Sequence, residues 1–156
     1  MAWSASKIFM ALIEDVLENT TAMDMNSDTF LVALYDNDIT PDQTVASAST
    51  AYDAGVWASS GNEVSEAGQW ATGGVALASV TSTRSSNVYT FDAADTASGS
   101  AADLAAVFGC LVYDDTIATP VANQGVCYNY FGGSNSVVNG TFTVVWNASG
   151  IFAITA

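Results

Sequence analysis

The sequence contains no histidine, only two basic side chains and only two cysteines. Its 156 residues carry sixteen acidic side chains against Lys7 and Arg84, which gives a formal net charge of -14. Without an imidazole there is no Ser-His-Asp or Cys-His nucleophile pair, no histidine general base and no histidine metal ligand. The commonest routes to catalysis near neutral pH are therefore missing. We expect a structural or binding protein rather than an enzyme, with no catalytic residue and no cofactor.

The scarcity of basic side chains also limits the partners. Nucleic acid binding draws its affinity from Lys and Arg, so a chain of this charge would be repelled by phosphates. The apolar stretch near the N-terminus is interrupted by Lys7, Glu14, Asp15 and Glu18, is too short to span a bilayer and lacks the features of a signal peptide. We therefore expect neither a nucleic acid partner nor a membrane association.

What the sequence does contain is enough apolar material for a core. Half of the residues are hydrophobic and 11% are aromatic, whereas disordered acidic segments have few of either. At this length we expect a single domain over residues 1–156. It divides into a helical segment (1–25), a first strand with long loops (26–72) and a β-rich core (73–156).

A helix is predicted between Ser6 and Asn19, because apolar pairs recur there every four residues and lay one stripe along a helix. Ser4 or Ser6 can cap its start, and we expect the stripe to pack against the β core. The pairs are Ile8-Phe9, Leu12-Ile13 and Val16-Leu17, and the acidic residues expected on the solvent side are Glu14, Asp15 and Glu18.

After the helix the sequence is typical of short strands rich in Val, Thr, Phe and Tyr, separated by Gly, Asn, Asp and Ser. The chain between the first two strands should be a long loop over residues 36–50. Residues 147–150 should form a hairpin that joins the last two strands. The predicted strands are 29–35, 75–81, 87–91, 104–113, 125–131, 140–146 and 151–155. The fold class is therefore mainly β: an antiparallel β-sandwich or partly open barrel with one N-terminal amphipathic α-helix.

The two cysteines, Cys110 and Cys127, fall in consecutive predicted strands that a hairpin would join. If they face one another, the same register places Gly109 opposite Tyr128 and Val107 opposite Tyr130. Three interpretations remain open: buried free thiols, a cross-strand disulfide and part of a metal site. The absence of further ligands disfavours a metal, and a reducing cytosol favours free thiols.

An acidic loop is the other candidate site. Asp36, Asn37, Asp38 and Asp42 supply oxygen ligands of the kind that Ca²⁺ prefers, but the loop lacks the glycine and the closing glutamate of an EF-hand. Asn and Asp are also common turn residues, and this interpretation is favoured. The Asp114-Asp115 pair is likewise expected to be a hairpin turn. We therefore predict no metal ligand, and whether Asp36, Asp38 and Asp42 bind a cation is left open.

Tyr52, Trp57 and Trp70 stand in otherwise loop-like sequence. Such side chains either anchor an excursion of the chain to the core or form an aromatic platform for a ligand. The anchoring role is favoured.

The order of these features resembles a family of small structural proteins encoded by tailed bacteriophages, which includes capsid decoration and minor head proteins. The segments that carry the resemblance are Ala2-Trp3 and residues 28–35, 40–42, 62–65, 71–77, 88–95, 131–133 and 140–152. The Ser/Ala segment around residues 44–60 and the cysteine pair depart from the family pattern.

The resemblance implies a virion structural protein, and we expect a decoration protein on the outer surface of the phage head, assembled in the host cytoplasm. Its partner would be the major capsid protein lattice, and a homotrimer would fit this role. Packaged DNA would repel a chain of charge -14, which favours the outside of the shell. The alternative is a tail- or fibre-associated module that binds a host surface receptor or glycan, for which Tyr52, Trp57 and Trp70 are the candidate residues.

Overall fold

The structure is a computed structural model that describes residues 3–156. Strand residues make up 39% of the chain and helical residues 10%, so the predicted mainly β class with an N-terminal helix is confirmed. The elements in chain order are β1 (Lys7–Ile8), α1 (Met10–Leu17), β2 (Phe30–Tyr35), α2 (Ser47–Thr50), the 3-10 helix η1 (Gly55–Trp57), β3 (Val75–Ala76), β4 (Thr81–Ser85), β5 (Val88–Asp92), β6 (Thr96–Ala97), β7 (Ala102–Asp114), β8 (Gly125–Gly140), β9 (Thr143–Val144) and β10 (Phe152–Thr155).

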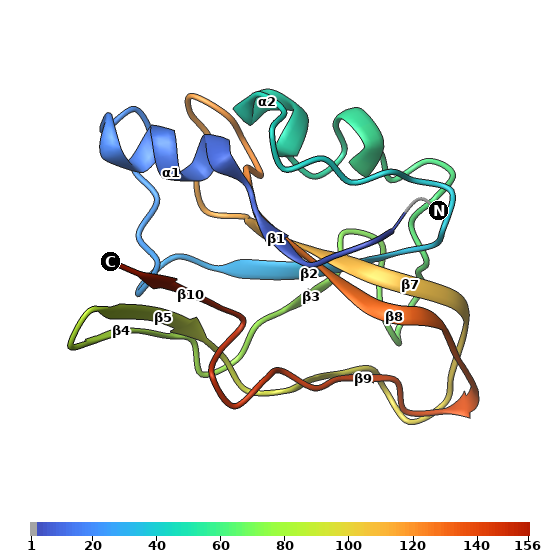
Figure 1. The fold of residues 1–156 in the computed structure, drawn as a ribbon. Helices are drawn as coiled ribbons and strands as arrows, with labels where there is room; N and C mark the ends of the chain where they lie inside the picture. Colours follow the sequence, from blue (N-terminus) through green and yellow to red (C-terminus); the bar gives the residue numbers. More distant parts are fainter. Residues whose placement is uncertain (1–2) are drawn as a thin grey trace.

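The strands form three antiparallel sheets of unequal size. The largest has five strands in the order β1-β8-β7-β2-β3, and the smaller ones have the orders β10-β5-β4 and β6-β9. In Figure 1 the helices lie above the large sheet and the two small sheets lie below it. The large sheet is therefore covered on both faces, which explains why β2 reads as a continuous apolar run instead of an alternating one.

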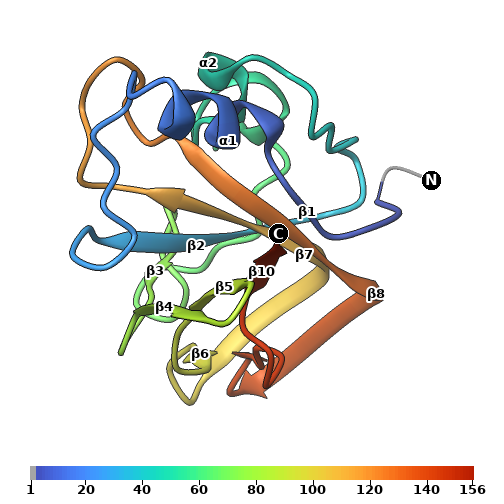
Figure 2. The ribbon, with the colours of Figure 1, turned by 60° about the vertical axis from the view of Figure 1, so that its left-hand side comes forward.

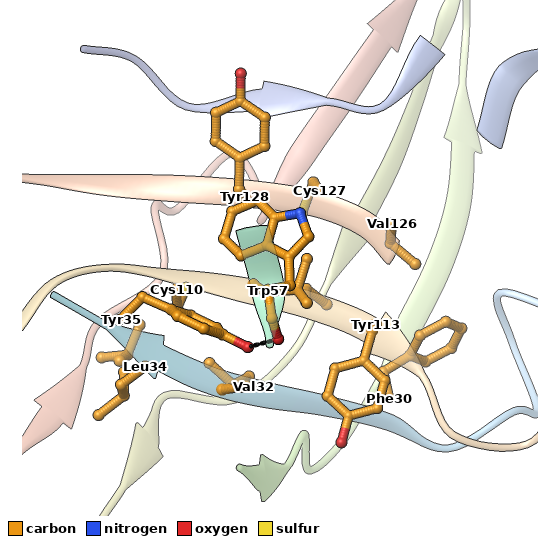
Figure 3. Packing of buried hydrophobic residues seen from close by; sticks show 14 of the residues in the cluster. Phe30, Val32, Leu34, Tyr35, Trp57, Cys110, Tyr113, Val126, Cys127 and Tyr128 are labelled. Carbon is orange, nitrogen blue, oxygen red and sulfur yellow. Dashed lines mark hydrogen bonds between the residues drawn. The ribbon is translucent and has the colours of Figure 1, made fainter. Parts of the chain in front are cut away.

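Aromatic side chains join these layers. Between the large and the three-stranded sheet, the rings of Phe30 and Phe91 meet with their centroids 5.1 Å apart. On the helical side, Trp57 packs edge-on against Tyr35 at 5.2 Å. Figure 3 shows Trp57 beside Tyr35, with the Tyr35 hydroxyl donating to the Trp57 carbonyl oxygen. One contiguous hydrophobic cluster includes all four side chains.

The helix begins later than the apolar pattern predicts. Lys7 and Ile8 pair with Tyr128 and Cys127 of β8, and the Phe9 amide donates to a β8 carbonyl, so these residues are extended. The predicted serine cap is wrong as well, because the Ser6 hydroxyl accepts the Tyr130 amide. Sheet pairing over a long sequence distance prevails here over the local helical periodicity.

The predicted register of the cysteine strands is wrong by two residues. Cys110 is opposite Asn129, and Cys127 is opposite Val112, while Gly109 faces Tyr130. An offset of two leaves every side chain on the same face of the sheet, so apolar patterning alone does not distinguish the two registers. Val107 is opposite Asn135 because β8 has an irregular pairing around Gly132 and Gly133, both at positive φ.

The predicted hairpin between the last two strands is also wrong. β9 pairs with β6, whereas β10 pairs with β5, so residues 147–150 carry the chain from one small sheet to another. The single strand predicted over residues 75–81 is divided between the end of the large sheet and β4. These errors concern pairing partners, which are set by contacts distant in sequence.

Candidate attachment surface

An apolar groove lies between α1 and the three-stranded sheet, with a volume of about 440 Å³. The side chains that line it come from the helix, from the segment that follows it, and from β5 and β10. They are Leu12, Ile13, Val16, Leu17, Met25, Tyr89, Phe152 and Ile154. Figure 2 brings this side of the molecule forward, with α1 above and β10 and β5 below.

Several of these side chains are exposed although they are large and apolar. Leu17 has 80% of its surface exposed, Val16 has 49% and Ile154 has 39%. Phe152 forms the floor, since its ring packs against those of Tyr89 and Phe91. The predicted apolar stripe of α1 is therefore shared: Leu12 is buried in the core, and Val16 and Leu17 remain open to solvent.

A second cavity of about 280 Å³ lies near this groove, and Phe152 lines both. Its walls are β1, β8 and the first residues of β10. β1 and β10 are the terminal strands of their sheets, so each pairs on one side only among the described residues. Residues of both terminal strands therefore line the same cavity.

The charges around the groove are unevenly placed. On the helix, Glu14 and Glu18 are exposed; Glu14 lies one turn before the groove residue Leu17, whereas Glu18 has no groove residue three or four positions away. The two basic residues lie on the strand side: Lys7 lines the second cavity, and Arg84 is the register partner of Tyr89. The lining of the helical wall is apolar, and Glu14 places a negative charge at its rim.

Asp15 differs from its acidic neighbours on α1. It was expected on the solvent side, but it is half-buried and its carboxylate accepts hydrogen bonds from Ser47 and from Gln124, the latter at 2.7 Å. It therefore ties α1 to α2 and to the segment before β8. This leaves the acidic face of the helix to Glu14 and Glu18.

The aspartates of the acidic loop act in local turns. Asp36 accepts the Asp38 amide at 2.9 Å, and Asp42 accepts the amide and the hydroxyl of Thr44. These bonds from Thr44 lower the pKa of Asp42, which stays exposed. Within residues 3–156 no three acidic or thiol side chains are grouped in a way that could hold a metal ion. The loop bonding agrees with turn formation.

Both cysteines are free thiols in the interior. Burial raises the pKa of Cys110 well above its ordinary value and that of Cys127 to about 12, so neither is a thiolate near neutral pH. The Cys127 sulfur also accepts a weak hydrogen bond from Asn129 at 3.6 Å. Each thiol therefore acts as a small core residue.

The isolated aromatic residues anchor loops. Trp57 and Trp70 are buried, and the Trp70 indole N–H donates to the Val32 carbonyl oxygen at 2.9 Å. Tyr52 is half-buried, stacks on Tyr113 at 4.8 Å and donates its hydroxyl to Glu63 at 2.9 Å. The three aromatic side chains do not form an open platform.

One pair of carboxyl groups was not expected from the sequence. Asp114 is buried at the end of β7, where one carboxyl oxygen accepts the amides of Thr116 and Ile117. Its other oxygen has no donor, and Asp28 is a neighbouring acidic group. Burial, together with the neighbouring Asp28, raises the pKa of Asp114 to about 6. The signal in the sequence was an aspartate directly after a buried apolar strand.

The helices in the described part of the chain are short: α1 has eight residues. None has the length and apolar character that a bilayer crossing requires.

Comparison with models of protein families, with curated proteins and with solved structures gives no match. The resemblance to phage virion proteins therefore has no independent counterpart among these comparisons. Function has to be argued from the surface itself.

Proposed function

We propose that this chain is a non-enzymatic virion structural protein that decorates the outer surface of a tailed-phage capsid. The observation that carries the proposal is the open apolar groove between α1 and β10. Large exposed apolar patches on a folded chain mark contact surfaces, since they are costly to leave in water. This groove offers apolar side chains from α1, β5 and β10 and no convergent set of titratable groups, which suits attachment better than chemistry.

Charge supports the outer position. With sixteen acidic and two basic side chains, the surface repels packaged DNA and needs a partner with complementary charge or with apolar contacts. The major capsid protein lattice is the proposed partner, and the chain would join it after synthesis in the host cytoplasm. A homotrimer at three-fold positions is compatible with this role.

The proposal includes the absence of catalysis. The Asp28-Asp114 pair is the arrangement that could argue against it. Two interacting carboxyl groups with one raised pKa are the arrangement that acid-base enzymes use. Asp114, however, has no exposed surface, so a substrate has no access to its carboxyl group. The pair is better explained as a structural contact between the segment before β2 and the end of β7.

The tail-associated alternative loses its original support. It rested on Tyr52, Trp57 and Trp70 as ligand-binding aromatics, but both tryptophans are buried and Tyr52 stacks on Tyr113. Binding to the tail is therefore not proposed, and it is one of the outcomes that the cosedimentation experiment below distinguishes.

The test is cosedimentation of the purified chain with empty heads and, separately, with isolated tails of the phage that encodes it. Saturable binding to heads alone is expected, with native mass spectrometry of the released protein reporting whether it is a trimer. An unrelated protein of similar negative charge is the control for unspecific adsorption. Binding to tails alone, or to neither particle, would contradict the proposal.

A further inference from the structure

We infer that the groove holds an extended segment of a partner protein, which adds a strand to the open edge of β10 and places apolar side chains against α1. The inference rests on the proposed role as an attached component and adds how the chain is held. The segment is expected to alternate apolar and polar residues and to carry Lys or Arg where it passes the helix.

β10 has one open edge, because it is a terminal strand of its sheet. β10 pairs with β5 in a register that sets Ile154 opposite Tyr89, and the Ala156 amide donates to Asn87. Because ladder bonds of an antiparallel pair alternate, the N–H and C=O groups of Ala153 and Thr155 point away from β5. No strand of residues 3–156 takes them up. An open edge of this kind is a template for another strand.

The open edge of β10 and the apolar groove form one surface. Ile154 and Phe152 line the groove, and residues of β1, β8 and β10 line the neighbouring cavity. An added strand would continue the three-stranded sheet toward β1. In such a strand every second side chain would point toward α1, where Val16 and Leu17 are exposed. Main-chain bonds and apolar anchors would thus act together.

The net charge of the chain bears on which kind of partner the groove can hold. A second copy of this chain would bring another net charge of -14 to a surface whose helical wall has Glu14 at its rim. Like charges across an interface oppose association, whereas basic side chains would complement this wall. Lys7 lies at the far end, beside the second cavity. The occupant is therefore a different protein with an apolar segment and basic residues on the helix side.

The experiment compares four variants with the wild-type chain. Leu17→Ser removes the most exposed groove side chain, and Val138→Ser is its matched control, because Val138 is 83% exposed on β8 and does not line the groove. Ala153→Pro removes an outward amide and fills the open edge, which an edge strand tolerates, and Ala153→Ser is its control. Thermal unfolding first establishes that each variant folds. If Ala153→Pro does not fold, the comparison of Leu17→Ser with its control Val138→Ser tests the inference.

Two binding assays are then run. In the first, peptides are selected from a displayed random library on wild-type protein. The inference requires enrichment of basic peptides with alternating apolar residues, which bind Leu17→Ser and Ala153→Pro about tenfold or more weakly and the controls unchanged. No enrichment, or equal binding to all variants, overturns it. In the second, the same proteins are sedimented with empty heads.

The two assays separate the inference from the proposed function. Equal binding of all variants to heads would overturn the groove inference and leave the decoration role intact. Loss of head binding in Leu17→Ser and Ala153→Pro alone would support both. If the wild-type chain does not bind heads, the decoration role fails, and the peptide selection still decides whether the groove accepts a strand.

Discussion

Asp114 shows how much the surroundings of one residue determine. Its carboxyl group is buried at the end of β7 beside Asp28, and burial raises its pKa to about 6. In the unfolded chain the same group has its ordinary value near 3.8. Between these two values the folded state binds a proton that the unfolded state does not bind. Stability from this group is therefore full below about pH 4 and is lost as the pH rises through about 6.

We predict that Asp114→Asn stabilises the protein at pH 7 by about 1 to 3 kcal/mol and flattens the pH dependence of unfolding between pH 4 and 7. The amide keeps the oxygen that accepts the Thr116 and Ile117 amides, and it can donate to Asp28. Urea unfolding at a series of pH values measures the effect. Asp115→Asn, at an exposed position, is the control and should leave the profile unchanged. A destabilised Asp114→Asn at pH 7 would contradict the assigned role.

A second residue-scale prediction concerns the Tyr35 hydroxyl, which donates to the Trp57 carbonyl oxygen at 2.6 Å in a buried site. Tyr35→Phe removes this bond and leaves the carbonyl with one donor, the Asp53 amide at 3.1 Å, so the free energy of unfolding should fall by about 1 kcal/mol. Tyr130→Phe is the matched control, because Tyr130 is half-buried and stacks on Trp3 at 6.3 Å. Equal stabilities of the two variants in urea would show that the Tyr35 bond contributes nothing.

At the scale of the element, the pairing of β7 with β8 fixes the state of the cysteines. Cys110 is opposite Asn129 and not opposite Cys127, so the two thiols are diagonal neighbours. Diagonal positions lie about 7–8 Å apart, beyond ordinary disulfide geometry. Both thiols are also buried with raised pKa values.

We therefore predict that neither thiol of the native protein reacts with Ellman's reagent, and that both react once the chain is unfolded. Unfolding temperatures should be the same with and without a reductant. A Cys110→Ala single variant, which keeps one thiol, calibrates the reaction. A reductant-dependent unfolding temperature would indicate a disulfide and would contradict the observed register.

The elements differ in how far the sequence predicts them. β2, β5 and the starts of β7 and β8 follow from local runs of apolar and β-branched residues, as does the helix from residue 10 onward. The start of α1, the β7-β8 register and the partner of β10 do not follow, because each depends on a strand far away in sequence. The groove was likewise only half predictable: the apolar stripe of α1 was visible, but not that β10 leaves it partly uncovered.

At the scale of the whole molecule, the charge of -14 leads to a prediction about salt. Mutual repulsion of the acidic side chains opposes the compact state, and there are only two basic side chains to offset it. Raising ionic strength from about 10 mM to about 150 mM shortens the Debye length from ~30 Å to ~8 Å and screens this repulsion. The unfolding temperature should therefore rise steadily over that range.

Measuring the same transition in NaCl and in CaCl₂ at equal ionic strength separates screening from specific binding. Because Asp36 and Asp42 are engaged in turns, the two salts should give curves that nearly coincide. Saturable stabilisation by millimolar Ca²⁺ alone would instead reveal a cation site in the loop of Asp36, Asp38 and Asp42. An Asp38→Asn variant, whose side chain remains exposed, would then lose the stabilisation by Ca²⁺ and keep the stabilisation by ionic strength. A protein that gains stability when its acidic side chains are screened is suited to a partner that brings positive charge, as expected for the segment at β10.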